Sequence, residues 1–426
     1  MICRGFMIGS LVLLWAAEAQ AESPDSITAT PGALWRVALE HSGELQASGY
    51  SADSKQFLYL GSGRLPDPML RIGFSPRPLE TRNGPVDFTA TFSQKIPWPG
   101  GLSDSRDRMM YAAEAAEIEE SITALRLRTE ITSLWASMYV TNEEITVLSR
   151  EMERLEHLWE LADVRYRSGQ AGLSVLLAIE NRSEVVRARL FGAELELESL
   201  TLEMYSLAGV EDARLSWPDS VPEEEFFLQG IEKDYVLQDM PAVSRSLALV
   251  RSAAAAAEAS RAALYPGFEV GATWSVIGQP EVEMGAVDPG RDGFAVFAGF
   301  SVPLGYSGSA ENSEAAALGS TASEYLHRQL EADQEAVRQR RVNRVRSLLE
   351  MHGAYTATVI PNTRAMYQLA VADWISGRTD IENVIEILAD LEEAELEKAS
   401  IYSEAVKNYA KLLEIEGRNT EEGEFL

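Results

Sequence analysis

Apolar positions recur every three or four residues over most of the chain, and this pattern predicts long helices. The first long helix is predicted over residues 105–167, which contain no proline and at a rise of about 1.5 Å per residue would form a helix of roughly 95 Å. Apolar or small residues alternate there at steps of three and four, which is typical of coiled-coil packing. The predicted seam consists of Ala124, Leu127, Ile131, Leu134, Met138, Thr141, Ile145, Leu148, Met152, Leu155, Trp159 and Ala162.

Other stretches have the same period. A second long helix is predicted over 309–375, where Pro361 must kink it or interrupt its hydrogen bonding. Shorter helices are predicted over 173–207, 234–264 and 381–416, and a mostly helical segment over 26–60, where Gly43 and Gly49 weaken the pattern. We therefore expect each long helix to pack against two short ones stacked end to end, with residues 209–233 as a linker at the waist.

The period changes to two in four short runs, which predict β-strands. These runs are 70–75, 86–93, 268–276 and 294–302, each with one apolar face and a small or more polar opposite face. They fit either a half-buried sheet in a soluble domain or strands that cross an outer membrane. Four membrane strands could not close a barrel, and an open sheet edge has no water to bond in lipid. Membrane strands would therefore be pooled between chains, eight from two copies or twelve from three.

One segment occurs twice. Leu158–Leu177, LWELADVRYRSGQAGLSVLL, has a close variant at Met366–Ile385, MYQLAVADWISGRTDIENVI, at an offset of 208 residues. Each copy predicts a helix that ends in Ser-Gly and turns into a second helix, and Thr379 with Glu382 predicts a capping box. The sequence thus predicts a duplication with a first structural repeat at 22–208 and a second at 234–416.

Composition narrows the possible functions. Residues 1–21 are expected to form a secretory signal peptide, which contains Cys3, the one cysteine of the chain. The mature chain would then have no disulfide and no thiolate. Lys and Arg total 37 against 66 Asp and Glu, a net charge of -29 that disfavours nucleic acid, and residues 417–426 form an acidic tail. The four histidines are far apart and form no metal-binding motif, so we expect neither an enzyme nor a cofactor.

In the order of these features the chain resembles the TolC family of outer-membrane efflux proteins. The resemblance rests on the repeated strand-turn-helix passages, FSQKIPWPGGL at 92–102 and FSVPLGYSGS at 300–309, and on the repeated hairpin tips. It implies a mainly α fold with a small β part, in which a homotrimer forms a twelve-stranded outer-membrane β-barrel continued by a periplasmic α-helical barrel. It also implies a passive exit duct docked through a periplasmic adaptor to an inner-membrane transporter. PDPML at 66–70 and IPWPGGL at 96–102 resemble the heavy-metal efflux members.

The resemblance also assigns site residues. The Ser-Gly turns would be the periplasmic tips, where adaptor contact is expected at Ser168, Gly169, Gln170, Ser376, Gly377 and Arg378. The acidic positions of the family's constriction correspond to Asn383, which departs from the acidic pattern, and Glu386. Trp374 occupies an aromatic position that can help to close the tip, and packing against a neighbouring helix is the alternative. For the whole chain the alternative is a soluble periplasmic coiled-coil scaffold or adaptor.

Overall fold

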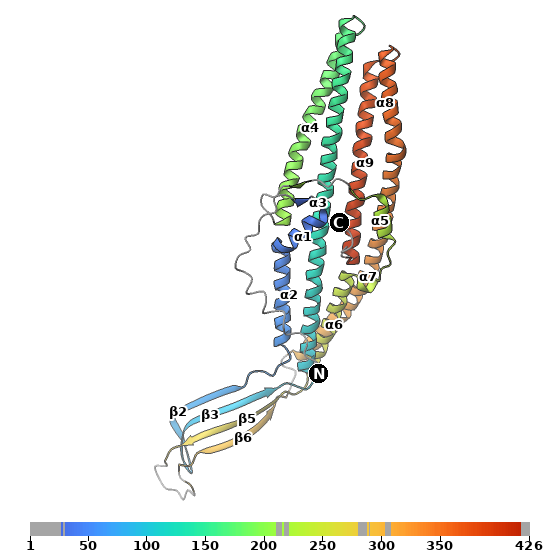
Figure 1. Ribbon diagram of the computed structural model, residues 1–426. Coiled ribbons are helices and arrows are strands. Elements are labelled where there is room, and N and C mark those ends of the chain that lie inside the picture. Colours follow the sequence, from blue (N-terminus) through green and yellow to red (C-terminus); the bar gives the residue numbers. More distant parts are fainter. Residues whose placement is uncertain are drawn as a thin grey trace.

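The structure is a long helical rod with a small sheet at one end and two helical hairpin tips at the other (Figure 1). It is a computed structural model that describes residues 27–28, 30–209, 215–216, 221–279, 288, 290–302 and 308–418. The predicted signal peptide and all but the first two residues of the predicted acidic tail lie outside the described residues.

The rod contains helices from both halves of the chain, and most of their bounds lie within a few residues of the predicted ones, although α6 begins seven residues later than predicted. The first half contributes α3 (Gly101–Arg167) and α4 (Leu173–Ala208), and the second half contributes α6 (Pro241–Ala262), α7 (Ser309–Ala354), α8 (Ile360–Ile375) and α9 (Ile381–Glu416). The predicted N-terminal helical segment forms two helices, α1 (Pro31–His41) and α2 (Gly43–Gly61). They meet at Ser42, whose hydroxyl caps α2 by accepting a hydrogen bond from the backbone N–H of Leu45 at 3.4 Å.

The second long rod is interrupted where Pro361 predicted an interruption. A five-residue π-helical turn, Tyr355–Val359, separates α7 from α8, and Pro361 lies in the first turn of α8. Proline has no N–H to donate to the preceding turn, and a widened turn accommodates this loss. The rod therefore continues as two helices joined by a π turn.

The helices lie in one open row, as Figure 1 shows for α4, α3, α9 and α8. The helix α3 packs against α4 near the tips and against α2 near the sheet. In the second half, α7 packs against α6 and α9, and α8 packs against α9. The predicted stacking of two short helices on each long one is therefore confirmed. The extensive contact of α3 with both α6 and α9, which joins the two halves, was not predicted.

The predicted seam of α3 holds with one exception. Most of its members are buried or half-buried, but Trp159 has 44% of its surface exposed, and the neighbouring Leu158 is buried in its place at 2%. The prediction for Trp159 was wrong because steps of three or four residues after Leu155 allow either Leu158 or Trp159 in the seam. The packing of the partner helices decides which of the two is buried.

The sheet has the strand order β2-β3-β5-β6, all antiparallel. Its strands are β2 (Met69–Thr81), β3 (Gly84–Ile96), β5 (Phe268–Ile277) and β6 (Gly293–Phe300). The register of β2 shifts between Phe74 and Leu79, around Pro76 and Pro78, and prolines are tolerated there because β2 is an edge strand. Both edges, β2 and β6, pair on one side only within the described residues.

The segment between the repeats carries structure that the sequence pattern did not predict. It contains β4 (Leu215–Ser216), which pairs with β1 (Ile27–Thr28), and the helix α5 (Glu224–Ile231). The acidic run begins α5, with Glu223 as the N-cap and Glu224 and Glu225 in the first turn, where negative charge complements the helix dipole. Phe227 of α5 is fully buried and stacks edge-on against Tyr402 and Tyr409 of α9.

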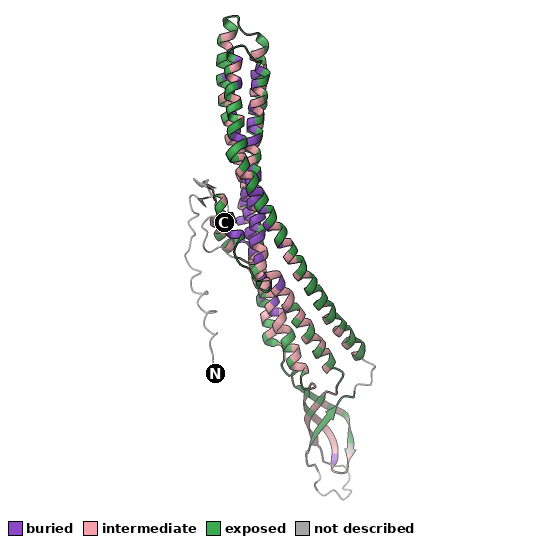
Figure 2. Cartoon of the chain, turned by 90° about the vertical axis from the view of Figure 1, so that its right-hand side faces the viewer, coloured by how far each residue is buried: buried purple, intermediate pink, exposed green. Residues whose placement is uncertain are grey.

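Buried side chains gather along the middle of the rod and in the hairpin region (Figure 2). The waist cluster surrounds Trp135 and Ile131 of α3, both fully buried, with residues of α1, α5, α7 and α9. The tip cluster joins Leu148 and Leu155 of α3 to Val186 of α4 and Leu388 of α9.

Candidate functional site: the hairpin tips and the sheet

The two predicted tips form the same turn. Gly169 and Gly377 have φ values of 76° and 75°, a left-handed conformation that glycine adopts without strain. In each tip the N–H after the glycine donates to a carbonyl five residues earlier, Gln170 to Arg165 and Arg378 to Asp373, both at 2.8 Å. This arrangement is a Schellman motif, which closes the helix end.

The six residues predicted to contact an adaptor are all exposed at these turns. A Cβ atom added at Gly169 or Gly377 would meet nothing within 4 Å, so the space beside both glycines is open. The Arg378 side chain is held by Asp373, to which its Nε donates at 2.8 Å. Adaptor contact at these positions remains a prediction.

The predicted capping box of the second tip is absent. The N-cap residue of α9 is Asp380 rather than Thr379, and no side chain caps the helix there. The prediction was wrong because the Schellman turn uses one residue more than the sequence pattern suggested before the helix restarts.

Trp374 is buried, and it contacts the other hairpin. Its surface is 4% exposed, whereas its counterpart Tyr166 is 42% exposed. Arg165 of α3 donates through Nη1 to the carbonyl oxygens of Trp374, at 3.1 Å, and Ile375, and its guanidinium carbon lies 5.2 Å from the centre of the Trp374 ring. A cation is favourable at the carbonyl end of a helix. Arg165, which the sequence did not single out, therefore links the two tips.

Asn383 and Glu386 are exposed on α9, whereas Trp374 is buried, so the three predicted constriction residues do not share one environment. Glu386 lies in an acidic stripe. Carboxylates at steps of four and three residues lie on one face of a helix, and four exposed ones follow this spacing: Glu386, Asp390, Glu393 and Glu397. Exposed Glu382 precedes them by one turn.

The two faces of the sheet differ sharply. On one face, cross-strand neighbours are apolar and their large side chains are mostly exposed, in the rows Leu70, Phe92, Ala272 and Val296, and Ile72, Ala90, Trp274 and Phe294. On the other face they are mostly small or polar, in the rows Arg71, Thr91, Thr273 and Ala295, and Gly73, Thr89, Ser275 and Gly293. Val296 and Phe294 have about three quarters of their surface exposed, 76% and 74%. An exposed apolar face of this size indicates contact with lipid or protein.

The flanks of the helical row are also apolar. On one flank α2 exposes Tyr50 and Phe57, and α4 exposes Phe191 and Leu195. The other flank has exposed residues on α7 and α8: Leu318, Tyr325, Leu326, Met366 and Leu369. Both sides of the subunit thus present apolar surface from the sheet to the tips.

The described residues contain neither a metal-binding cluster nor a membrane-spanning helix. No group of three or more His, Asp, Glu or Cys residues is placed to hold a metal ion there. No helix in that part of the chain is both long and apolar enough to cross a bilayer.

Comparison with known proteins places the fold. No protein-family model matches the chain, and no curated protein matches it in sequence. Solved structures do match. CusC, described for its folding and transmembrane channel formation, aligns with a TM-score of 0.77 at 13% identity over 91% of this chain and 92% of its own. The outer-membrane channel OprN aligns with a TM-score of 0.74 at 13% identity, over 91% of this chain and 90% of its own. The outer membrane protein VceC of Vibrio cholerae aligns with a TM-score of 0.74 at 15% identity, over 92% of this chain and 97% of its own. The chain therefore has the fold of these outer-membrane proteins, as the sequence resemblance implied.

Proposed function

We propose that this chain, which has the fold of solved outer-membrane channels, is a TolC-like exit duct of the outer membrane. Three copies would pool their strands into a twelve-stranded barrel, and their helices would continue it as a periplasmic tunnel. The observation that carries this proposal is the four-stranded sheet, with one exposed apolar face and two unpaired edges, at the end of a helix of 67 residues. That helix spans about 100 Å, which is far longer than a bilayer is thick.

The sheet by itself cannot stay in a membrane. The unpaired N–H and C=O groups of β2 and β6 would find no water in the hydrocarbon core, so each edge needs another strand. Further copies of the chain supply such strands, because the edge β2 of one copy can pair with β6 of the next. The apolar flanks formed by α2 with α4 and by α7 with α8 lie on the same two sides and support the same neighbours. The choice of three copies rather than two rests on the resemblance to the TolC family.

The duct would take its cargo from other proteins. The exposed tip residues, Ser168 to Gln170 and Ser376 to Arg378, are the proposed contact for a periplasmic adaptor, which joins an inner-membrane transporter. The acidic stripe from Glu386 to Glu397 would line the tunnel and favour cations over anions. Metal ions are the proposed cargo, since the PDPML and IPWPGGL segments resemble the heavy-metal branch.

Two adjacent residues of β6 test the membrane placement. Val296 lies on the apolar face and Ala295 on the opposite face. An arginine on the lipid side of a barrel costs about 2–4 kcal/mol near the bilayer midplane, whereas a lumen position tolerates it. We expect Val296→Arg to abolish assembly in the outer membrane and Ala295→Arg, the matched control, to retain it.

Membrane fractionation and native electrophoresis in detergent provide the measurement. The wild-type protein should require detergent for release and migrate as a trimer. Release of the wild type with the periplasm, without detergent, would refute the duct and favour the soluble scaffold. Equal fractionation and equal migration of the two arginine variants would show that the apolar face of the sheet does not contact lipid.

A further inference from the structure

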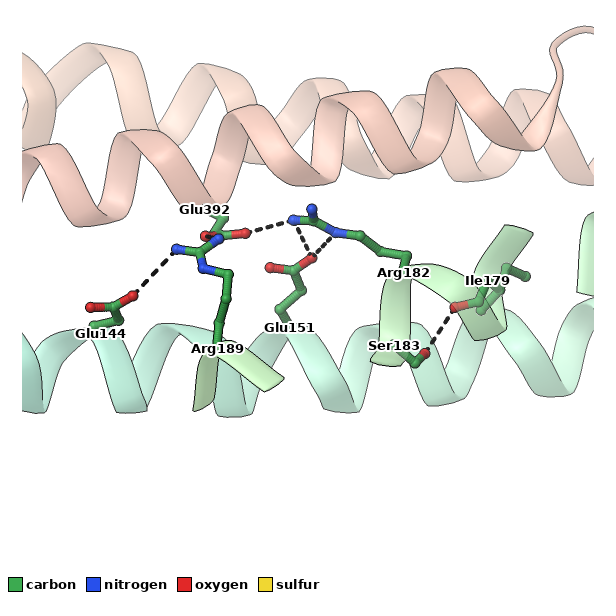
Figure 3. Close-up of polar contacts among 7 residues, drawn as sticks. All are labelled: Glu144, Glu151, Ile179, Arg182, Ser183, Arg189 and Glu392. Carbon is green, nitrogen blue, oxygen red and sulfur yellow. Dashed lines mark hydrogen bonds and ion pairs between the residues drawn. The ribbon is translucent and has the colours of Figure 1, made fainter. Parts of the chain in front are cut away.

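A buried charged layer joins the two helical hairpins between the tip cluster and the waist cluster (Figure 3). Glu151 comes from α3, Arg182 and Arg189 from α4, and Glu392 from α9. The Glu151 side chain is fully buried and that of Glu392 is 5% exposed, so both carboxyls lie in the interior of the rod.

One guanidinium is shared by these two carboxyls. Arg182 donates through Nε to Glu151 Oε1 at 2.8 Å and through Nη2 to Glu392 Oε2 at 2.6 Å. The other Glu151 oxygen, Oε2, is buried and accepts no hydrogen bond. Arg189 donates to Glu392 and, at 3.3 Å, to Glu144, which is 32% exposed. If every group were ionised, the carboxylates of Glu144, Glu151 and Glu392 would face the guanidiniums of Arg182 and Arg189. One negative charge would then be left uncompensated.

A buried excess charge is costly, and a proton removes it. Burial, followed by the neighbouring carboxyl of Glu392, raises the pKa of Glu151 from its ordinary 4.5 to about 7. Two carboxylates on one buried guanidinium repel each other, which favours a proton on one of them.

The surrounding elements supply no charge that replaces this proton. On α8, burial raises the pKa of the Tyr367 hydroxyl, so this group is neutral. The positive charge of Arg154 on α3 partly opposes this rise in the pKa of Tyr367. The neighbouring carboxyl, Glu395 of α9, is already held by Arg364 at 2.7 Å and Arg150 at 3.6 Å, and these two arginines are about half exposed to water. They are matched to Glu395 and do not reach Glu151.

We propose that Glu151 and Glu392 form a proton-operated clasp between the first helical hairpin, α3 with α4, and the second, α8 with α9. A proton on Glu151 removes the repulsion between the two carboxyls, so that Arg182 holds α9 against α3 and α4. Loss of this proton places two negative charges side by side in a dry contact and loosens α9. The clasp is a property of a single subunit, whereas an effect on tunnel width rests on the proposed function.

The direction of the pH dependence follows from the proton affinity of Glu151 in the docked and in the separated hairpins. The docked hairpins bind the Glu151 proton more tightly than separated, hydrated hairpins would, so docking is strongest below pH 4.5 and is lost progressively up to about pH 7. The docking equilibrium falls by up to tenfold per pH unit in this window, or by up to about 300-fold in total.

Infrared titration of the full-length protein in detergent tests the proton directly. A protonated carboxylic acid has a C=O stretching band that a carboxylate lacks. We expect a band that disappears near pH 7 in the wild type and is missing in Glu151→Gln. Glu153→Gln, which removes an exposed carboxyl of α3 outside this network, should retain it. Absence of this band from the wild type would overturn the proposal even if Glu151→Gln did not fold.

Hydrogen exchange of the α9 amides around Glu392 tests the clasp. After correction for the intrinsic pH dependence, exchange in the wild type and in Glu153→Gln should accelerate as the pH rises to 7, and exchange in Glu151→Gln should not. Exchange that is independent of pH in the wild type, or a wild-type profile in Glu151→Gln, would refute the clasp. Neither the infrared band nor hydrogen exchange depends on membrane assembly or conduction. Either result can therefore refute the clasp without refuting the proposed duct, and failure of the duct would leave the clasp testable.

Discussion

Replacing Arg165 with alanine should loosen the contact between the two hairpin tips. The guanidinium donates to the carbonyl oxygens of Trp374 and Ile375 and lies 5.2 Å from the Trp374 ring centre. A hydrogen bond to a charged group contributes about 1.5–3 kcal/mol, and a cation–π contact at an exposed site about 0.5–1 kcal/mol. Because Arg165 is only half-buried and water replaces part of what is lost, we expect a loss of about 2 kcal/mol, or roughly 30-fold in the docking equilibrium of the tips.

Hydrogen exchange in the last two turns of α8 measures this loss. The amides of residues 370–375 should exchange roughly 30-fold faster in Arg165→Ala than in the wild type. Arg167→Ala is the matched control, since Arg167 pairs with Asp163 of its own helix at 2.8 Å and is exposed. Unchanged exchange in Arg165→Ala would show that the contact does not hold α8. Equal acceleration in both variants would mean that the loss of any tip charge is sufficient.

Three further substitutions test the core, the sheet and the tunnel. Trp135→Ala should destabilise the waist by about 3–5 kcal/mol, measured as a lower urea midpoint, because the indole is fully buried; an unchanged midpoint would contradict the packing described for the waist. Gly271→Ala should prevent assembly of the sheet, since the new Cβ would lie 2.4 Å from the Phe297 ring and 2.6 Å from the backbone oxygen of Phe92; wild-type mobility on native electrophoresis would exclude this clash. Glu386→Ala should reduce cation selectivity in planar bilayers more than Asn383→Ala, and equal selectivity would place Glu386 outside the tunnel.

Much of the fold could be predicted because helices and strands leave different periods in the sequence. The ends of α4 and α9 were predicted to within one residue, and the four strands of the antiparallel sheet appeared as alternating runs. Proline at 361 identified the interruption of the second rod, although its form as a π turn could not be inferred, since proline is compatible with either a kink or a widened turn. The break at Ser42 depends on a single hydroxyl cap, which the helical period does not reveal.

Contacts between helices that are distant in sequence could not be predicted. Arg165 aligns with Asp373 in the repeat, and nothing in that alignment places its guanidinium on the end of α8. The sequence pattern did not single out Glu151, although it follows the seam residue Leu148 by three positions and therefore lies on the same face. A charged residue at such a position is the signal that could have identified the buried layer.

The π turn at Tyr355–Val359 also sets the rotational phase of the second rod. Successive residues of an α-helix are rotated by about 100°, and a π turn takes up one residue more than an α turn. Side chains of α8 are therefore offset by about 100° from where an uninterrupted helix would direct them. Converting this turn to α-helix without a deletion would rotate the buried side chains of α8 away from α9, while α7 would keep its orientation toward α6. Deleting one residue would instead restore an ordinary α turn and leave α8 facing α9, so the angular position of α8 depends on the number of residues in this turn.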